Sequence, residues 1–193
     1  LLLEDLPVAV IKVGLLGSHV IARKVVELID RAGPVPVVLD PVLAAGGGAD
    51  LAGEMLLSVV KQELLPRSTW VTPNVPEAYR LGGHATLEVC AERMMALGAR
   101  NVLVTGTHAE GSNVVNRWYG PDGVRQWEWP RLAGDYHGSG CTLAAALGAC
   151  LALGHSAESA VSSAQSYTYL ALQSAYPLGR GQWFPARSID LAF

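Results

Sequence analysis

The chain has 193 residues, of which half are hydrophobic and only 16% are charged, and its formal net charge is −3. Soluble domains usually carry about 25% charged residues, so this composition favours a sheet that is buried on both faces and needs no polar side. The pI near 5.9 argues against a nucleic-acid partner, which would select a basic surface. The length allows one domain with a sizeable core.

No segment predicts a membrane partner. The most apolar stretch, 142–153, is shorter than the ~18 residues needed to cross a bilayer. Glu4 and Asp5 interrupt the first residues, which lack the basic start of a signal peptide. The three cysteines form no CxxC pair; this argues against disulfides and structural zinc and favours a cytoplasmic location. The histidines show no metal-ligand spacing either.

Strands and helices alternate through the first half of the chain. Apolar, β-branched runs predict buried strands at 8–14, 36–40, 69–72 and 101–105. Helical spacing predicts that the first helix, which Gly33 stops, buries Ile21, Val25 and Leu28. The second helix follows a loop of three glycines, 46–48, and ends at Pro66. Its expected buried stripe is Leu51, Met55, Leu56, Val59, Val60 and Leu64.

The regular alternation of strands and helices ends after these units. A short helix at 76–81 precedes a longer one, for which Thr86 is the expected N-cap. The buried stripe expected behind this cap is Leu87, Cys90, Ala91 and Met94. The turn sequence at 120–123 predicts an antiparallel hairpin of 113–119 with 124–129. Two helices, 138–153 and 157–174, and an irregular tail complete the chain. Three tryptophans of the hairpin suit an interface, a lid or core packing equally: Trp118, Trp127 and Trp129.

Together these elements predict one α/β domain spanning 1–193, with a mostly parallel central sheet, helices on both faces and a late β-hairpin. In such sheets ligands bind at the carboxyl ends of the strands. The residues that follow the four strands are Gly14, Asp40, Thr72 to Asn74, Thr105 and Gly106.

The segment 137–142 has the most specific local pattern, because two glycines open an apolar helix there. Backbone N–H groups at Gly138, Ser139 and Gly140 would form an anion site at the positive end of the helix dipole. The same field is expected to stabilise the thiolate of Cys141. The alternative is a flexible turn beside a buried, inert cysteine. The segment matches neither the P-loop nor the dinucleotide-binding pattern.

Three oxygen-bearing side chains complete the candidate site. Asp40 ends a buried strand, while Asn74 and Glu77 lie three residues apart at a helix start and can share one face. Such groups suit Mg²⁺, which takes few protein ligands together with waters and phosphates. Taken singly, each has a structural explanation as a loop cap, a turn residue or a first-turn acid. Their conjunction with the anion site is what favours chemistry.

The segments 39–48, 71–78, 105–108 and 137–147, in this order, resemble the ribokinase-like superfamily. In detail they are similar to the hydroxymethylpyrimidine/phosphomethylpyrimidine kinases of thiamine biosynthesis, and Cys141 favours this branch over the sugar kinases. The resemblance implies ATP-dependent phosphorylation of 4-amino-5-hydroxymethyl-2-methylpyrimidine, of its monophosphate, or of both. A pyridoxal or pyridoxine kinase is the alternative enzyme, and a non-catalytic pyrimidine-binding domain of the same fold is the alternative without turnover.

The resemblance also implies partners and roles. It implies Mg²⁺ as cofactor, ATP as co-substrate and a homodimer. Its residue roles are an anion hole of Gly138, Ser139 and Gly140; a catalytic Cys141; ATP and phosphate binding by Asn74, Glu77, Thr105 and Gly106; substrate binding by Gly14 and Leu15; and metal binding by Asp40 and Glu77.

The chain departs from the family pattern in two places. Thr105 stands where the family usually has a phosphate-binding lysine, so either another cation compensates for the missing charge or the rate of phosphoryl transfer is lower. The glycine-rich N-terminal segment of the family, which supplies much of the substrate pocket, has no counterpart before Leu1. The sequence therefore predicts a kinase domain that lacks its first segment.

Overall fold

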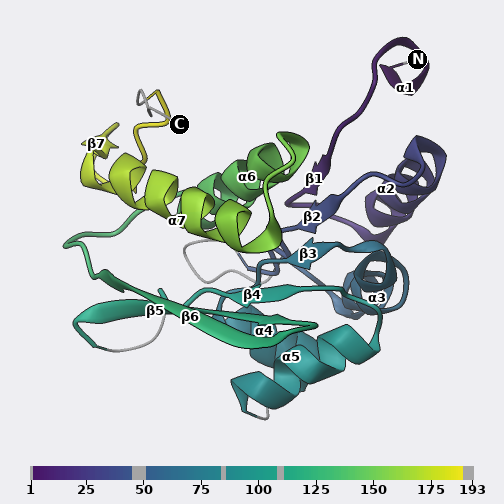
Figure 1. Cartoon of the computed structure of the whole chain (residues 1–193), viewed down its shortest axis with the longest axis horizontal. Coiled ribbons are helices and arrows are strands. Elements are labelled where there is room, and N and C mark those ends of the chain that lie inside the picture. Colours follow the sequence, from purple (N-terminus) through teal and green to yellow (C-terminus); the bar gives the residue numbers. More distant parts are fainter. Residues whose placement is uncertain (1, 45–50, 84–85, 108–110, 189–193) are drawn as a thin grey trace.

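The computed structural model describes residues 2–44, 51–83, 86–107 and 111–188 (Figure 1). The glycine loop expected at 46–48 lies outside the described residues, as do His84 and His108. No helix within the described ranges is long and apolar enough to cross a membrane.

A six-stranded sheet forms the centre of the molecule, and its strands lie in chain order. The first four strands pair in parallel, and the last two continue the sheet in antiparallel fashion. The expected mostly parallel sheet with a late hairpin is therefore confirmed. The strands are β1 (Ile11–Val13), β2 (Val37–Leu39), β3 (Trp70–Val71), β4 (Val102–Val104), β5 (Asn113–Gly120) and β6 (Gly123–Pro130).

Helices connect the parallel strands and follow the hairpin. They are α1 (Leu2–Asp5), α2 (His19–Ala32), α3 (Glu54–Val59), α4 (Val75–Gly82), α5 (Leu87–Ala96), α6 (Ser139–Ala152) and α7 (Ala157–Gln173). A π turn, η1 (Val60–Leu64), and a 3-10 turn, η2 (Leu65–Arg67), continue α3 without a break. The tail, which the sequence left irregular, forms a separate two-stranded sheet of β7 (Tyr176–Pro177) and β8 (Trp183–Phe184).

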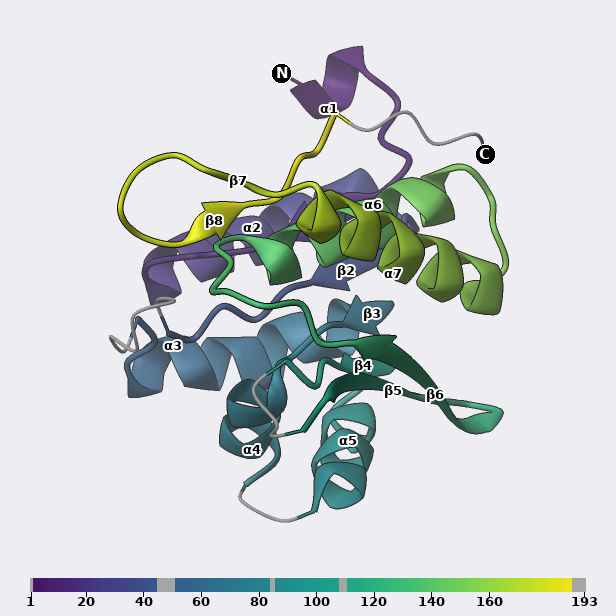
Figure 2. The same ribbon diagram turned by 90° about the vertical axis from the view of Figure 1, so that its left-hand side faces the viewer.

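The helices cover both faces of the sheet, as expected. Val37 and Leu39 pack into one hydrophobic cluster with α2 to α5, whereas Val38 packs into a second cluster with α6 and α7. Successive side chains of a strand point to opposite faces, so the two clusters lie on opposite sides of β2. Figures 1 and 2 show the same division, with α6 and α7 on one side of the sheet.

The expected buried stripes of the first two helices need correction. Ile21 and Leu28 of α2 are exposed, and the buried positions are Ala22, Val26 and Ile29. Both sets have the same helical spacing and differ by one residue in phase, so periodicity alone cannot choose between them. In the second helix Met55 is likewise exposed.

The third predicted stripe is correct. Thr86 caps α5, since its Oγ1 accepts a hydrogen bond from the Val89 N–H at 3.3 Å. Cys90, Ala91 and Met94 are buried behind that cap, and Leu87 packs against them from the rim.

Core packing explains the tryptophans of the hairpin. Trp118 is buried beneath α6 and α7, and its ring lies 5.2 Å from that of Trp70 and 6.5 Å from that of Trp127. Trp129 packs against Tyr169 of α7 with ring centroids 5.0 Å apart. These side chains join the hairpin to the helical layer.

Gly148 lies buried in the middle of α6, and replacing it with alanine should stabilise the protein. A Cβ there would meet only methyl groups of Val10 and Val38, at 3.6 to 3.9 Å, which is ordinary contact. Alanine in a helix interior is favoured over glycine by about 0.5–1 kcal/mol. We expect thermal unfolding of Gly148→Ala to shift upward by a few degrees. A lower midpoint would contradict the close but unstrained packing of α6 on the sheet.

Candidate active site

The carboxyl ends of the parallel strands meet the N-terminus of α6. Asp40 directly follows β2, and Thr105 directly follows β4. Asn74 forms a parallel bridge with Thr105 just beyond β3 and β4. A Cβ on Gly140 of α6 would lie 4.0 Å from Oδ1 of Asp40. Strand ends and the predicted anion loop therefore share one edge of the sheet.

The loop that opens α6 presents backbone N–H groups without a side-chain cap. Gly138 is the N-cap, with φ of 85° in the left-handed region, and as a glycine it has no side chain that could cap the helix. The first turn contains no acidic residue. Its first N–H groups have no partner within the helix, and the helix dipole is positive there. An anion-binding role for Gly138, Ser139 and Gly140 stays a prediction that this geometry suits.

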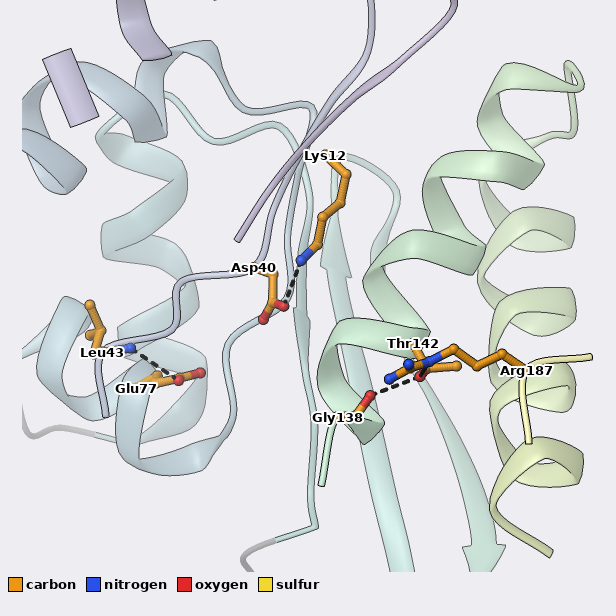
Figure 3. Close-up of polar contacts among 7 residues, drawn as sticks. All are labelled: Lys12, Asp40, Leu43, Glu77, Gly138, Thr142 and Arg187. Carbon is orange, nitrogen blue, oxygen red and sulfur yellow. Dashed lines mark hydrogen bonds and ion pairs between the residues drawn. The ribbon is translucent and has the colours of Figure 1, made fainter. Parts of the chain in front are cut away.

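Lys12, which the sequence analysis did not single out, pairs with Asp40. Its Nζ lies 3.1 Å from Oδ2 of Asp40, and the carboxylate is buried (Figure 3). A lysine between Ile11 and Val13 in a buried strand is the sequence signal that could have revealed this pair, because such a charge requires a partner.

The pair lies against Cys141. Partial burial of the sulfur and the charge of Asp40 raise the pKa of the Cys141 thiol above its ordinary value. Lys12 and Arg187 act in the opposite direction and are outweighed. The expected stabilisation of a thiolate is therefore wrong for the resting chain. The helix dipole is a local feature of the sequence, whereas the neighbouring carboxylate of Asp40 acts on the thiol only in the folded chain. A catalytic role of Cys141 as such stays a prediction.

Asn74 and Glu77 cap α4. The Glu77 N–H donates to Oδ1 of Asn74 and the Asn74 N–H donates to Oε2 of Glu77, both at 2.9 Å. The Leu43 N–H donates to Oε1 of Glu77 at 3.4 Å. Burial raises the pKa of Glu77 to about 7, and the charge of Asp40 adds to this rise, while the hydrogen bonds from Asn74 and Leu43 oppose it. This carboxyl group thus caps α4, and its pKa depends on the charge of Asp40.

Two successive hydrogen bonds hold Gly106 in place. Its N–H donates to Oδ1 of Asn116 at 3.0 Å, and Nδ2 of Asn116 donates to Oε1 of Gln165 at 2.8 Å. Both side chains are buried. The chain of contacts ties the loop after β4 to the hairpin and to α7. Sequence reasoning missed Asn116 and Gln165, since nothing local marks them as partners.

The residues predicted to bind substrate lie at the end of β1. Leu15 is 60% exposed, so its side chain is free to form an apolar wall for a ligand. Gly14 lies beside the Lys12 ammonium group, and a Cβ there would be 2.6 Å from Nζ. Substrate binding by Gly14 and Leu15 stays a prediction.

Arg187 is the second cation that sequence reasoning missed. Its Nε donates to Oγ1 of Thr142 in the first turn of α6 at 3.1 Å (Figure 3). The two residues are 45 positions apart, and no local pattern in the tail marks the contact.

The sequence profile of the family described as Phosphomethylpyrimidine kinase matches residues 1–185. The chain belongs to this family. Within the phosphomethylpyrimidine kinase family, the chain is 39% identical over 188 residues to the thiamine biosynthesis bifunctional protein ThiED of Geobacter sulfurreducens. It is 33% identical over 185 residues to the hydroxymethylpyrimidine/phosphomethylpyrimidine kinase of Bacillus subtilis.

These matches cover 92% of the chain in both cases, but 38% of the Geobacter protein and 68% of the Bacillus protein. This phosphomethylpyrimidine kinase family member thus spans only part of the length of its relatives. Its fold is similar to that of the pyridoxal kinase from Staphylococcus aureus in complex with ADP, with a TM-score of 0.87 and 26% identity. That comparison covers 96% of this chain and 71% of the other.

The residues of this family member fit a magnesium ion held largely through water and phosphate. No three His, Cys, Asp or Glu side chains in the described ranges form a metal-binding group. However, Asp40 and Glu77 lie close enough for charge to act between them. The buried Oγ1 of Thr72, just after β3, has no hydrogen-bond partner in the described part of the chain. Hard oxygen donors such as these are what Mg²⁺ prefers.

Proposed function

We propose that this chain transfers the terminal phosphoryl group of ATP to 4-amino-5-hydroxymethyl-2-methylpyrimidine, to its monophosphate, or to both. The observation that carries the proposal is the position of the buried Asp40 carboxylate at the uncapped N-terminus of α6, where a Cβ on Gly140 would lie 4.0 Å from its Oδ1 and where its charge raises the pKa of Cys141. In a chain of the phosphomethylpyrimidine kinase family, this position supports a role for Asp40 as proton acceptor beside the proposed anion site. Phosphoryl transfer needs little more than positioning and charge stabilisation.

The backbone of α6 holds the transferring group. The N–H groups of Gly138, Ser139 and Gly140 face the phosphoryl oxygens and stabilise the charge on them as the bond to the leaving oxygen breaks. Gly138 suits this position because its φ of 85° turns the chain sharply into the helix. Asn74 and Glu77 fix the start of α4 and, with Thr105 and Gly106, form the neighbouring rim for ATP.

The acceptor proton passes through Cys141. The substrate hydroxyl attacks phosphorus, its O–H bond breaks, and the proton goes to Sγ of Cys141 as the thiol proton moves to Asp40. The P–O bond to ADP breaks in the same displacement. This relay needs the thiol to be protonated at rest, which agrees with its raised pKa. Lys12 holds the Asp40 carboxylate in place.

Mg²⁺, when bound, neutralises phosphate charge and orients the nucleotide. Asp40 and Glu77 are the residues that would hold it. The pyrimidine ring is expected against Leu15 and Gly14 at the end of β1, where the exposed Leu15 side chain leaves room for an apolar contact.

A pyridoxal kinase is the second candidate, favoured by the close likeness to the Staphylococcus aureus pyridoxal kinase structure. Both compounds carry a ring hydroxymethyl group, so the same machinery serves either. The ratio of kcat/KM for the pyrimidine to kcat/KM for pyridoxal distinguishes the two. A ratio below one favours the pyridoxal kinase.

The direct test of the function measures ADP release with the pyrimidine and with its monophosphate in the presence of Mg²⁺. Turnover with either compound supports the proposal. No turnover, together with a ligand-induced rise in melting temperature, would instead identify a pyrimidine-binding domain that has lost catalysis.

Replacing Cys141 by alanine should lower kcat by about 100-fold or more, since general acid–base catalysis contributes about 10²–10⁴-fold. ATP affinity should change far less, because the backbone of α6 remains. Steady-state kinetics together with ATP binding by calorimetry checks both values. Cys150→Ala is the matched control, since Cys150 is a buried cysteine later in the same helix. Equal losses of kcat and of ATP affinity would contradict a role in the chemistry.

Two further proposals concern the setting of the protein. We expect a homodimer, which sedimentation velocity tests; a monomer at micromolar concentration would overturn it. We also expect a cytoplasmic location, since Cys90, Cys141 and Cys150 are free thiols, and fractionation of the source cells tests this.

A further inference from the structure

Arg187 lies in the segment that follows β8, and contacts with α7 hold its backbone. The Ala186 N–H donates to the carbonyl oxygen of Ala171 at 2.9 Å. The Tyr167 hydroxyl donates to the carbonyl oxygen of Arg187 at 2.6 Å. The residue itself is exposed. These hydrogen bonds to α7 hold the backbone of Arg187 in place, and its guanidinium group extends from that position.

The guanidinium lies over the first turn of α6. Its Nε donates to Oγ1 of Thr142 at 3.1 Å, and that hydroxyl donates to the carbonyl oxygen of Gly138 at 2.8 Å (Figure 3). A Cβ on Gly138 would lie only 2.7 Å from Nη2 of Arg187. Thr142 thus orients one edge of the guanidinium, and Nη2 lies directly beside the loop that presents the backbone N–H groups.

The charge around Arg187 is unbalanced. The first turn of α6 has no acidic residue, and no carboxylate within the described ranges forms an ion pair with Arg187. Asp40, which acts on the neighbouring Cys141, is already paired with Lys12. A cation held beside the positive end of a helix is unfavourable by itself, and an anion bound between the two removes the repulsion.

We propose that Arg187 is a phosphate-binding residue of this active site, acting together with the N–H groups of Gly138 to Gly140. The proposal rests on the proposed function and names a source for the positive charge that the sequence lacks at Thr105. A planar guanidinium presents paired N–H donors that match two oxygens of one phosphoryl group. That group belongs either to the nucleotide or to the pyrimidine monophosphate, whose oxygen chemistry is the same.

Calorimetric binding to Arg187→Gln tests the proposal without requiring turnover. The ligands are ADP, adenosine and hydroxymethylpyrimidine monophosphate, each measured against the wild-type chain. Loss of a charge-assisted contact should weaken one phosphate-bearing ligand by about 10- to 100-fold and leave adenosine unchanged. Weaker ADP binding assigns Arg187 to the nucleotide, and weaker monophosphate binding assigns it to the substrate. Unchanged affinity for both overturns the proposal.

Two further variants make the result specific. Arg187→Lys keeps the charge and should recover part of the lost affinity. Arg100→Gln removes an exposed arginine just before β4, at the opposite edge of the sheet, and should bind all three ligands like wild type. Equal melting temperatures establish that the variants fold. If the wild-type chain turns over the pyrimidine and Arg187→Gln binds ADP and the monophosphate as tightly as wild type, this proposal alone is overturned. Absence of wild-type binding and turnover overturns the proposed function as well.

Discussion

Replacing Gly106 by alanine is expected to lower the melting temperature by roughly 10 °C. The added Cβ would lie 2.1 Å from the carbonyl oxygen of Val115 and 2.9 Å from its carbonyl carbon. These are backbone atoms of β5, so no side-chain rotation can relieve the clash. Overpacking of this kind costs about 3 kcal/mol at the upper end of its usual range, and each kcal/mol shifts the midpoint of a domain this size by about 2–4 °C.

The same substitution should also impair catalysis. Moving β5 would break the hydrogen bond from the Gly106 N–H to Asn116, which in turn contacts Gln165 of α7. Thr105, beside Asn74, would shift with it. Scanning calorimetry and steady-state kinetics measure the two effects, and Gly148→Ala is the matched control because its expected shift has the opposite sign. A midpoint within about 2 °C of wild type would show that β5 yields easily and contradict the prediction.

The sheet and its functional edge could be predicted because both follow from local patterns. Short β-branched runs identify the strands, and parallel strands must end at one edge. Asp40 and Thr105 follow two such runs directly. The glycines before α6 are equally local. For these reasons the sequence already indicated which residues would meet.

The phase of α2 could not be predicted in this way. The set of Ile21, Val25 and Leu28 has the same spacing as the buried set that starts at Ala22. The choice depends on which face reaches the sheet. The small Ala22 side chain, fully buried in the structure, allows a close approach that hydrophobicity alone does not favour.

Long-range polar contacts were also beyond the sequence. Arg187 meets Thr142 across 45 positions, and Asn116 meets Gln165 across 49. Each depends on how α7 lies against α6 and the hairpin, which no local pattern specifies. The direction of the Cys141 pKa shift depends in the same way on burial and on Asp40, whose side chain reaches the first turn of α6 only in the folded chain.

Replacing Asp40 by asparagine should cause the largest loss of activity, because Asp40 touches every part of the proposed relay. It pairs with Lys12 and raises the pKa of both Cys141 and Glu77. Asparagine keeps the shape but cannot take up a proton. We expect kcat to fall by about 10²–10⁴-fold, the range of a general acid–base group. Single-turnover kinetics with saturating substrate measures this loss.

Asp30→Asn is the matched control for loss of an ion pair as such. Asp30 pairs with Arg67 on the surface, with oxygen–nitrogen distances of 2.7 and 2.8 Å. Replacing it by asparagine should leave kcat unchanged. The double variant Lys12→Met with Asp40→Asn removes both charges of the buried pair. It should regain stability relative to Asp40→Asn, which leaves Lys12 unpaired, but not activity. Recovery of activity in the double variant would reduce Asp40 to a structural partner of Lys12.

Thiol reactivity separates the relay from a general disturbance of the site. The charge of Asp40 raises the pKa of Cys141, so Asp40→Asn should lower that pKa. The thiolate fraction near pH 8 then rises, and alkylation by iodoacetamide becomes several-fold faster. Cys90 and Cys150 are buried while Cys141 is exposed, so the rate reports on the catalytic position. The relay requires faster alkylation of Cys141 together with slower catalysis in the Asp40→Asn variant. In that variant the thiol is more reactive, but the enzyme is slower because the thiol has lost its proton acceptor. An unchanged alkylation rate would mean that Asp40 does not act on this sulfur.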